Sequence, residues 1–509
     1  DITNPLALDP DQPVTNSAGA VLDPVMCLRR RVRIEPGKTV KVVFATAVAQ
    51  TRKYALELAE KYMDIKTAER MFELAWTRSQ VEARYLGLDA REAESYLELL
   101  PFILFTSSFK KNYEKYIIEN KCSQRDLWPF GISGDLPIVL VEVNEAEDIE
   151  TVKWALKGHE YWRVKGIYVD LVILINKKEG YYKPLSDQVL NAIAASHARE
   201  LTDTKGGVFV RNTSSLDESQ VALFYTAAKL IVKDSLEKFR SQIKAAKRSI
   251  TPVMPMPPEN GEDENHAAPI RNRDIQKKLR FFNGIGGFSE DGSEYVILLK
   301  NGIRTPAPWS NIVAGKNFGF LVTESGGGYT WAENSREYKL TPWANDPVSD
   351  PQGEVFFIND LDEGNLWSIT PMPAGDNGLY TITHGFGYTK FEHACFGLEQ
   401  VLTMFVPLDS QVKVCIVSIA NLMDKKRNLS LTYYTRPVLG TDEKSTSPYI
   451  VTRRSGKGLL FVENKFSGDF SERMSFMATS IEEKAFCGDR DMFFGSGCKP
   501  SGTVGAGLN

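Results

Sequence analysis

The chain has 509 residues, enough for two to four domains of roughly 150 residues each. Hydrophobic residues make up 42% and charged residues 25%, as in globular proteins with a sizeable core, and the net charge of −4 argues against a general nucleic-acid binder, which needs a basic face. No apolar run reaches the roughly 20 residues that span a bilayer, so we expect no direct membrane insertion by this segment.

Cysteine usage points to a reducing compartment. The six cysteines are scattered and form no Cys-x-x-Cys pair, so the sequence predicts neither a disulfide framework nor a structural zinc site. Cysteines that stay reduced are typical of cytoplasmic proteins, so we expect a cytoplasmic location. The chain starts at Asp1 without an initiator methionine, and we therefore expect a fragment of a longer protein.

Residues 1–50 are predicted to be the end of a first β-sandwich. Apolar alternation at 32–34 and 40–44 flanks a Glu-Pro-Gly-Lys turn, which is the pattern of a hairpin. Residues 51–125 form a helical segment, because 52–62, 67–85 and 90–105 carry apolar residues at three- and four-residue spacing. Pro101 should bend or break the last of these helices.

Residues 126–249 alternate between strand-like apolar runs and segments with helical spacing of apolar residues, which predicts a small α/β layer. The expected strands are 137–141, 168–175 and 207–210, and the expected helices are 148–160, 186–198 and 216–246. A nucleotide-binding fold is excluded because no Gly-rich phosphate loop follows any of these strands. Residues 250–279 are rich in proline, then acidic, and are predicted to be a linker.

Residues 280–509 are predicted to form a large antiparallel β-supersandwich. Short alternating segments recur between Gly, Pro, Asn and Asp turns, and we expect strands at 295–299, 318–323, 354–358, 398–406, 412–419 and 429–435. A short similarity between 18–23 and 504–509 suggests two related sandwich domains. The predicted fold class is therefore mixed, with helical and α/β segments before the sandwich.

Candidate functional residues are most concentrated between Thr305 and Trp343. Three consecutive glycines, Gly326–Gly328, precede side chains that can stack on sugar faces or form several hydrogen bonds to sugar hydroxyls: Tyr329, Trp331, Asn334, Arg336 and Glu337. This mixture suits a carbohydrate, but a long loop packed on neighbouring domains explains it equally well. We expect 326–343 to project from the sandwich and to be poorly buried, because glycines weaken a strand interior.

A second cluster reads His-Gly-Phe-Gly-Tyr-Thr-Lys-Phe-Glu-His at 384–393. Two histidines and a glutamate could indicate a metal site, but the Gly-x-Gly break interrupts the strand and no third set of ligands is evident. We therefore predict no metal here and favour a loop that feeds a polar pocket or an interface.

Three segments carry a specific resemblance: F-G-F-L-V-T-E-S-G-G-G-Y-T-W-A-E-N-S-R-E, L-T-P-W-A-N-D-P and H-G-F-G-Y-T-K-F-E-H. They resemble the sandwich domain of cellobiose-phosphorylase-like glycoside phosphorylases. The fuller match is to 1,2-β-oligoglucan phosphorylases and the C-terminal region of cyclic β-1,2-glucan synthases. The resemblance implies a galactose-mutarotase-like supersandwich followed by an (α/α)6 catalytic barrel, in cis or from a second subunit.

The resemblance also implies a reaction. In that family an aspartic acid of the barrel protonates the glycosidic oxygen while inorganic phosphate, the co-substrate, attacks with inversion. That acid lies outside the matched region, so no catalytic residue and no cofactor is expected in this chain. Carried over, Tyr329, Trp331 and Arg336 would face a β-glucan oligosaccharide, and Tyr388, Thr389 and Lys390 would lie near the phosphate end. Lys390 stands where relatives carry arginine. A lysine keeps the positive charge but cannot make the two parallel hydrogen bonds that an arginine makes to a phosphate, which argues against direct phosphate recognition by Lys390.

Two functions remain open at this stage. The first is the non-catalytic part of an inverting phosphorylase or transglycosylating enzyme acting on β-1,2-glucan. The second is a carbohydrate-binding or scaffold module without catalysis. We expect a cytoplasmic location or a tether to the inner membrane through upstream segments. The choice between phosphorylase and synthase, the glucan linkage and length, and the oligomeric state stay open.

Overall fold

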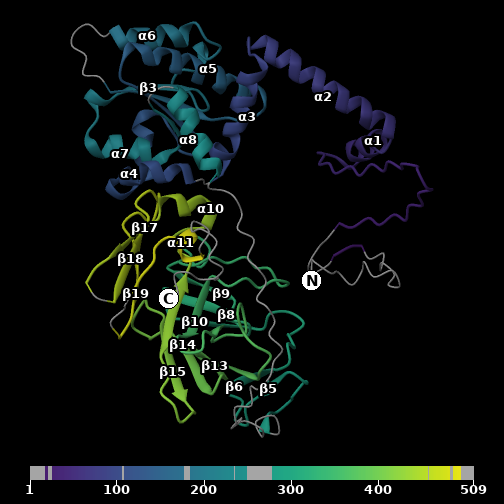
Figure 1. Ribbon diagram of the computed structural model, residues 1–509, viewed down its shortest axis with the longest axis vertical. Helices are drawn as coiled ribbons and strands as arrows, with labels where there is room; N and C mark the ends of the chain where they lie inside the picture. Colours follow the sequence, from purple (N-terminus) through teal and green to yellow (C-terminus); the bar gives the residue numbers. More distant parts are fainter. Residues whose placement is uncertain are drawn as a thin grey trace. The chain divides into compact units, whose positions relative to one another are not determined.

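The computed structural model describes residues 18–20, 26–105, 108–176, 184–233, 236–248, 278–456, 458–481 and 485–494 (Figure 1). The chain divides into two compact units: Asp1–Leu100 with Lys157–Ile167 form the first, and Pro101–Leu156 with Tyr168–Asn509 form the second. The predicted linker at 250–279 and the similarity at 504–509 fall almost wholly or wholly outside the described residues.

Helices dominate the described part of the first unit. Helix α1 spans Arg52–Tyr62, α2 spans Ile65–Tyr85, and α3 spans Ala90–Leu104 with Pro101 inside it. Thr51 and Asp64 cap α1 and α2, because each side chain accepts a hydrogen bond from a backbone N–H in the first turn. The three helices predicted from apolar spacing are therefore present, and Pro101 does not end α3.

Residues 26–50 carry no strand, so the predicted hairpin at 32–44 is absent. Its turn does form, since the Lys38 N–H donates to the Glu35 carbonyl oxygen at 3.0 Å. The flanking apolar side chains Val32, Ile34 and Phe44 are exposed. A two-stranded hairpin needs further strands or a covering helix to be stable, and the described residues supply neither here.

The α/β layer contains a parallel sheet of four strands in the order β3-β2-β1-β4. Strands β1 and β2 are buried at every position, which is why they read as continuous apolar runs. A 3₁₀ turn, helix α4 and a second 3₁₀ turn precede the sheet at Ser108–Tyr113, Glu114–Glu119 and Gln124–Phe130. The layer then runs β1(Ile138–Val143), α5(Ile149–Val164), β2(Asp170–Ile175), α6(Pro184–Ala194), β3(Val208–Asn212), α7(Glu218–Ala227), β4(Ala228–Val232) and α8(Leu236–Arg248).

The single long helix predicted at 216–246 is wrong. The segment holds α7, then β4, then α8, and β4 pairs in parallel with β1. Residues 228–232 read Ala-Lys-Leu-Ile-Val, a short apolar run that periodicity alone cannot distinguish from part of a buried helix. Tertiary pairing with β1 decides in favour of the strand.

The remaining strands are antiparallel and form four sheets (Figure 1). Their orders are β15-β14-β13-β12-β6-β5, β7-β8-β9, β11-β10-β16 and β17-β18-β19. The strands are β5(Gly286–Phe288), β6(Glu294–Leu299), β7(Ser310–Ala314), β8(Phe318–Thr323), β9(Gly328–Ala332), β10(Glu354–Asp360), β11(Leu366–Ser368), β12(Tyr380–Gly385), β13(Tyr388–Cys395), β14(Leu398–Phe405), β15(Val414–Asn421), β16(Leu429–Thr435), β17(Val451–Arg454), β18(Leu459–Glu463) and β19(Met474–Ala478). Two short helices, α10(Glu443–Thr446) and α11(Arg490–Phe494), complete this part.

One core joins the first three of these sheets. It gathers side chains from the six-stranded sheet, from β7 and β8, and from β10 and β11, among them the fully buried Phe320, Ile358, Ile382 and Phe391. Burial alternates residue by residue along β13 and β14, as expected for strands with one face in a core. The six strands predicted within 280–509 are all present.

Candidate carbohydrate site

Three aromatic rings gather on the outer face of the sheet β7-β8-β9. Along β9, Thr330 points into the core, so Tyr329 and Trp331 point outward. The Tyr329 ring lies 5.2 Å from the Trp331 ring and stacks on the Trp343 ring with centroids 5.2 Å apart. All three rings are half-buried. We call Tyr329, Trp331 and Trp343 the aromatic cluster.

The glycines before this cluster pack tightly, so the expectation of a projecting loop is wrong for 326–332. Gly328 has a φ of +138°, and a Cβ there would lie 2.0 Å from the Leu321 carbonyl oxygen. A Cβ on Gly326 would lie 2.6 Å from the Thr370 side chain. The glycines let strand β9 approach its neighbours, instead of weakening a loop. The rings nevertheless remain accessible on the outer face.

The exposed turn at 333–337 follows β9 and carries the polar side chains predicted for the site. The Asn334 Oδ1 accepts hydrogen bonds from the backbone N–H groups of Arg336 and Glu337, both at 2.9 Å. Asn334 therefore shapes the turn. The Arg336 side chain is 88% exposed and lies 3.4 Å from Glu337. A side-chain hydrogen bond from Ser335 to Tyr329 joins the turn to the aromatic cluster.

The predicted residues at 388–390 lie on a different sheet. Residues 384–393 form most of the β12–β13 hairpin, not a loop. Thr389 is buried and accepts a hydrogen bond from the Asn311 Nδ2 at 3.0 Å. The Tyr388 hydroxyl donates to Glu294, and this bond raises the pKa of Tyr388 to about 12. Lys390 pairs with Glu392 at 3.1 Å on the outer face.

Tyr388 and Lys390 therefore do not share a surface with the aromatic cluster. The six-stranded sheet and the sheet β7-β8-β9 contribute their inner faces to the same core, so their outer faces point away from each other. One sugar unit cannot contact both groups within this chain. The aromatic cluster, with the turn at 333–337, is the better candidate for a sugar surface.

His384 and His393, considered above as metal ligands together with Glu392, do not converge. His384 contacts the Trp309 carbonyl oxygen and the Thr389 hydroxyl, both at 3.2 Å, and burial lowers its pKa to about 4. Glu392 faces the outside of β13, whereas His393 faces the core. The alternation of the strand separates these side chains.

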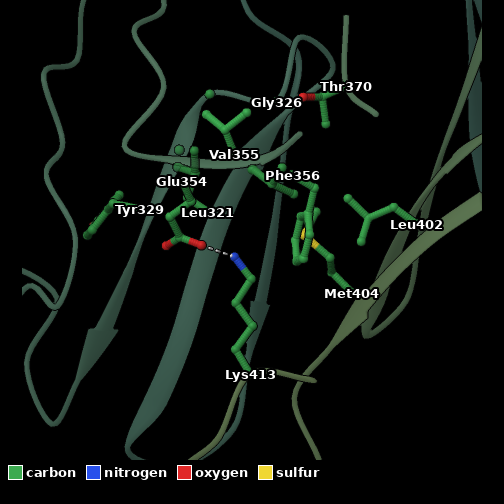
Figure 2. A pocket seen from close by; sticks show the side chains of 13 residues that line it. Leu321, Gly326, Tyr329, Glu354, Val355, Phe356, Thr370, Leu402, Met404 and Lys413 are labelled. Atoms are coloured by element: carbon green, nitrogen blue, oxygen red, sulfur yellow. Dashed lines mark hydrogen bonds and ion pairs between the residues drawn. The ribbon is translucent and has the colours of Figure 1, made fainter. Parts of the chain in front are cut away.

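A buried ion pair, not predicted from the sequence, lies behind the aromatic cluster. Glu354 at the start of β10 contacts Lys413 at 2.7 Å, and both side chains line a cavity of about 20 Å³ that Gly326–Gly328 and Tyr329 also help to line (Figure 2). Such a volume holds about one water molecule. The carboxylate also accepts hydrogen bonds from the hydroxyls of Thr330 at 2.5 Å, Thr341 at 2.7 Å and Tyr433 at 3.0 Å.

The environment of Glu354 keeps it ionised. Burial acts to raise the pKa of Glu354, but the Lys413 ammonium and the threonine hydroxyls outweigh it and lower the pKa to about 2. Glu354 holds Thr330 of β9 from the core side, and Thr330 lies between Tyr329 and Trp331 along the strand. The only signal in the sequence is an acidic residue directly before the apolar run of β10.

Comparison with known proteins now decides the family. Residues 1–65 and 293–504 match the domain described as glycosyl hydrolase 94, supersandwich domain. The chain belongs to glycosyl hydrolase family 94. The mixed fold class and the resemblance to this group of phosphorylases and synthases are confirmed. The family match also covers residues 1–65, which lie apart from the main sandwich in the sequence.

Several curated family 94 relatives are similar to the chain. It is 29% identical to the cyclic beta-(1,2)-glucan synthase NdvB of Rhizobium meliloti (strain 1021) over 96% of its own length and 18% of that protein. It is 28% identical to the N,N'-diacetylchitobiose phosphorylase of Vibrio proteolyticus over 41% of its length, and 29% identical to the solabiose phosphorylase of Paenibacillus borealis over 29%. The chain spans less than a third of each of these relatives.

None of the helices among the described residues has the length and apolar character needed to cross a bilayer.

Proposed function

We propose that the chain is a non-catalytic part of an inverting glycoside phosphorylase or transglycosylating enzyme that acts on β-1,2-glucan. Similarity over 96% of the chain to a protein named as a cyclic beta-(1,2)-glucan synthase supports this substrate. The family supports the reaction class, because its other similar members are named as phosphorylases. In this proposal the chain supports an (α/α)6 catalytic barrel, in cis or from a second subunit, and covers its substrate cleft.

The aromatic cluster is the single observation that carries the proposal. A sugar ring presents a flat C–H surface that stacks on an aromatic face, and Tyr329 and Trp331 offer two such faces on one side of a strand. Arg336 and Glu337 stand exposed on the turn that follows. Charged donors and acceptors beside stacked rings suit a chain of sugar hydroxyls.

Neither of the two buried glutamates near the aromatic cluster suits the role of catalytic acid. A general acid needs a raised pKa and access to the glycosidic oxygen. The pKa of Glu354 is lowered to about 2. Burial raises the pKa of Glu324, but this carboxylate is only 4% exposed and accepts hydrogen bonds from the Thr305 hydroxyl and the Trp309 N–H. In this proposal the catalytic aspartate belongs to the barrel, as the family resemblance implies.

The remaining assignments follow from the same proposal. Inorganic phosphate serves the whole enzyme as co-substrate, and the chain itself uses no organic cofactor. The enzyme works in the cytoplasm, free or tethered to the inner membrane. Nucleic acid is not a partner, in keeping with the net charge of −4.

Glucan binding by a Trp331→Ala variant tests the proposal. Stacking on one aromatic face contributes roughly 1–3 kcal/mol by analogy with nucleobases, so affinity for linear β-1,2-glucan should fall about tenfold or more. Isothermal titration calorimetry on the full chain measures this loss. Trp128→Ala is the matched control, because Trp128 is 59% exposed in the α/β layer and should leave affinity unchanged.

Equal glucan affinity of the wild type and Trp331→Ala would overturn the sugar-binding role. The alternative function, a carbohydrate-binding or scaffold module without catalysis, shares the aromatic cluster and predicts the same binding loss. Turnover separates the two functions. When Trp331→Ala is placed in the intact enzyme, the phosphorylase proposal requires a higher KM for long glucans with phosphate-dependent release of glucose 1-phosphate, whereas a scaffold shows no such release.

A further inference from the structure

Three potential metal ligands meet in the sandwich core, well apart in sequence from the aromatic cluster. His393 and Cys395 lie two residues apart on the inner face of β13, and Asp376 lies in the segment that leads into β12. One ligand atom from each side chain lies within 4.8 Å of the other two. His393 is 3% exposed and Cys395 is 1% exposed, so solvent does not surround this cluster.

The two ring nitrogens of His393 both face oxygen acceptors. Nδ1 lies 2.9 Å from the Leu379 carbonyl oxygen, and Nε2 lies 3.1 Å from the Asp376 Oδ1. A neutral imidazole carries only one N–H, so it can donate to only one of these oxygens. When Nδ1 donates to Leu379, Nε2 presents a lone pair, and this buried atom has no hydrogen-bond partner among the described residues. A cation bound to both Nε2 and the carboxylate would satisfy this lone pair.

We propose that Asp376, His393 and Cys395 bind one zinc ion or a similar borderline-soft divalent cation. Carboxylate, imidazole and thiolate are the three ligand types that zinc takes in proteins. The thiolate argues against magnesium and calcium, which prefer oxygen ligands. The Leu379 carbonyl accepts the Nδ1 proton and leaves Nε2 to the metal, which is the usual outer-sphere support of a metal-bound histidine.

The distances need only a small adjustment. A nitrogen and an oxygen that both bind a tetrahedral zinc lie roughly 3.3 Å apart, given bond lengths near 2.0–2.1 Å. The 3.1 Å between His393 Nε2 and Asp376 Oδ1 is close to that value. The Cys395 sulfur lies within 4.8 Å of both atoms and would have to move closer to bind the same ion. Three protein ligands leave one tetrahedral position for water or a small ligand.

The surroundings hold the ligands in place. The Tyr380 ring stacks on His393 with centroids 3.7 Å apart and planes 6° from parallel. The Gln400 amide donates to the Cys395 sulfur at 3.7 Å, a contact that suits a thiolate. A Cβ on Gly378 would lie 2.8 Å from the His393 ring, so glycine lets the Asp376 segment lie against it.

The Asp376 side chain is 15% exposed and offers the way in. A bound ion would tie the segment before β12 to the middle of the six-stranded sheet.

Metal content and cobalt spectroscopy of the full chain test the proposal. We expect one equivalent of zinc after purification by elemental analysis, and a thiolate-to-cobalt charge-transfer band when Co²⁺ is added to the chelator-stripped protein. Cys395→Ser should remove the band and weaken zinc binding at least about tenfold. Cys415→Ser is the control, because Cys415 is a half-buried thiol on β15 and should keep both signals.

Zinc added to the stripped wild type should also raise its melting temperature, since a ligand that binds only the folded state stabilises it. This readout does not depend on any variant folding correctly. Substoichiometric zinc, no cobalt band and an unchanged melting temperature would together overturn the proposal and leave His393 and Asp376 as neighbours without a metal. Loss of the band in Cys415→Ser but not in Cys395→Ser would overturn it as well.

Discussion

Glu354 and Lys413 are the residues on which the support of the aromatic cluster depends. Their side chains are only 12% and 11% exposed, and the carboxylate accepts from Lys413 and three hydroxyls. A buried charge pair often contributes little net stability compared with an apolar pair, but the loss of one partner is costly because the other charge remains buried. The pair therefore behaves as one unit, and single and double substitutions should differ in direction.

We expect Glu354→Gln to lower the free energy of unfolding by about 3–5 kcal/mol, because Lys413 then stays buried without a counter-charge. Urea unfolding at neutral pH measures this loss. The double variant Glu354→Gln/Lys413→Met should be more stable than Glu354→Gln alone. A double variant less stable than the single one would show that the ammonium does not depend on Glu354.

The same carboxylate predicts a pH dependence. The pKa of Glu354 falls from 4.5 in an unfolded chain to about 2 in the fold, so its contribution to stability is fully present above pH 4.5 and is lost as the pH falls toward 2. This contribution amounts to about 3 kcal/mol. Between pH 4.5 and pH 2, the free energy of unfolding of the wild type should fall more steeply with decreasing pH than that of Glu354→Gln. Parallel pH profiles of the two proteins would contradict the assignment.

Strand β9 is the element that presents the site, and Gly328 fixes its position. Gly328→Ala should destabilise the protein by roughly 2–4 kcal/mol, because a Cβ would lie 2.0 Å from the Leu321 carbonyl oxygen at a φ of +138°. Gly292→Ala is the control, since Gly292 has a φ of +76° but no atom within 4 Å of the added Cβ. That control should lose only about 1–2 kcal/mol. Thermal unfolding of both variants distinguishes packing from backbone strain; equal losses would refute the packing argument.

Elements were predictable from the sequence where the spacing of their apolar residues fits either a helix or a strand, but not both. The helices at 52–62 and 65–85 and the strands at 318–323 and 398–405 were found because their patterns fit a single period. Strand β4 was missed because a buried strand and a buried helix segment look alike. The glycines in and beside the strands at 328–332 and 388–395 predict loops, but the alternation of the neighbouring side chains decides in favour of strands.

The candidate sites were predictable only where their residues are neighbours in the chain. Tyr329 and Trp331 were found together because they lie two residues apart. Lys413 is 59 residues from Glu354 and looked like any surface lysine. Asp376 likewise gave no sign that it meets His393. Contacts of this kind arise from pairing between distant strands, and a single sequence does not record that pairing.

At the scale of the whole second unit, polar and aromatic contacts join the α/β layer to the sandwich. The Gln124 N–H donates to the Phe466 carbonyl oxygen at 3.0 Å, and Arg453 donates to the Ile118 carbonyl oxygen at 2.8 Å. The Lys110 ammonium lies 4.2 Å from the centre of the Tyr449 ring. Cation–π contacts of this kind strengthen when the groups are desolvated, as Lys110 and Tyr449 are.

Tyr449 contacts residues of both parts. Its ring packs against Phe466 with centroids 4.3 Å apart and against Lys110 of the α/β layer, and it is only 8% exposed. Tyr449→Ala removes both contacts and leaves a cavity, which should cost about 3–5 kcal/mol by comparison with other buried aromatic rings. We expect this loss to fall mainly on the coupling between the two parts.

Hydrogen exchange measured by mass spectrometry on the full chain tests this coupling. In the wild type, slow amides in β1–β2 and in β13–β14 should open with similar free energies, because both parts unfold together. In Tyr449→Ala the two sets should separate. Tyr168→Ala is the control, since Tyr168 is 55% exposed on the α/β layer and should leave the two sets together. Different free energies already in the wild type would show that the contacts at Tyr449 are too weak to couple the parts.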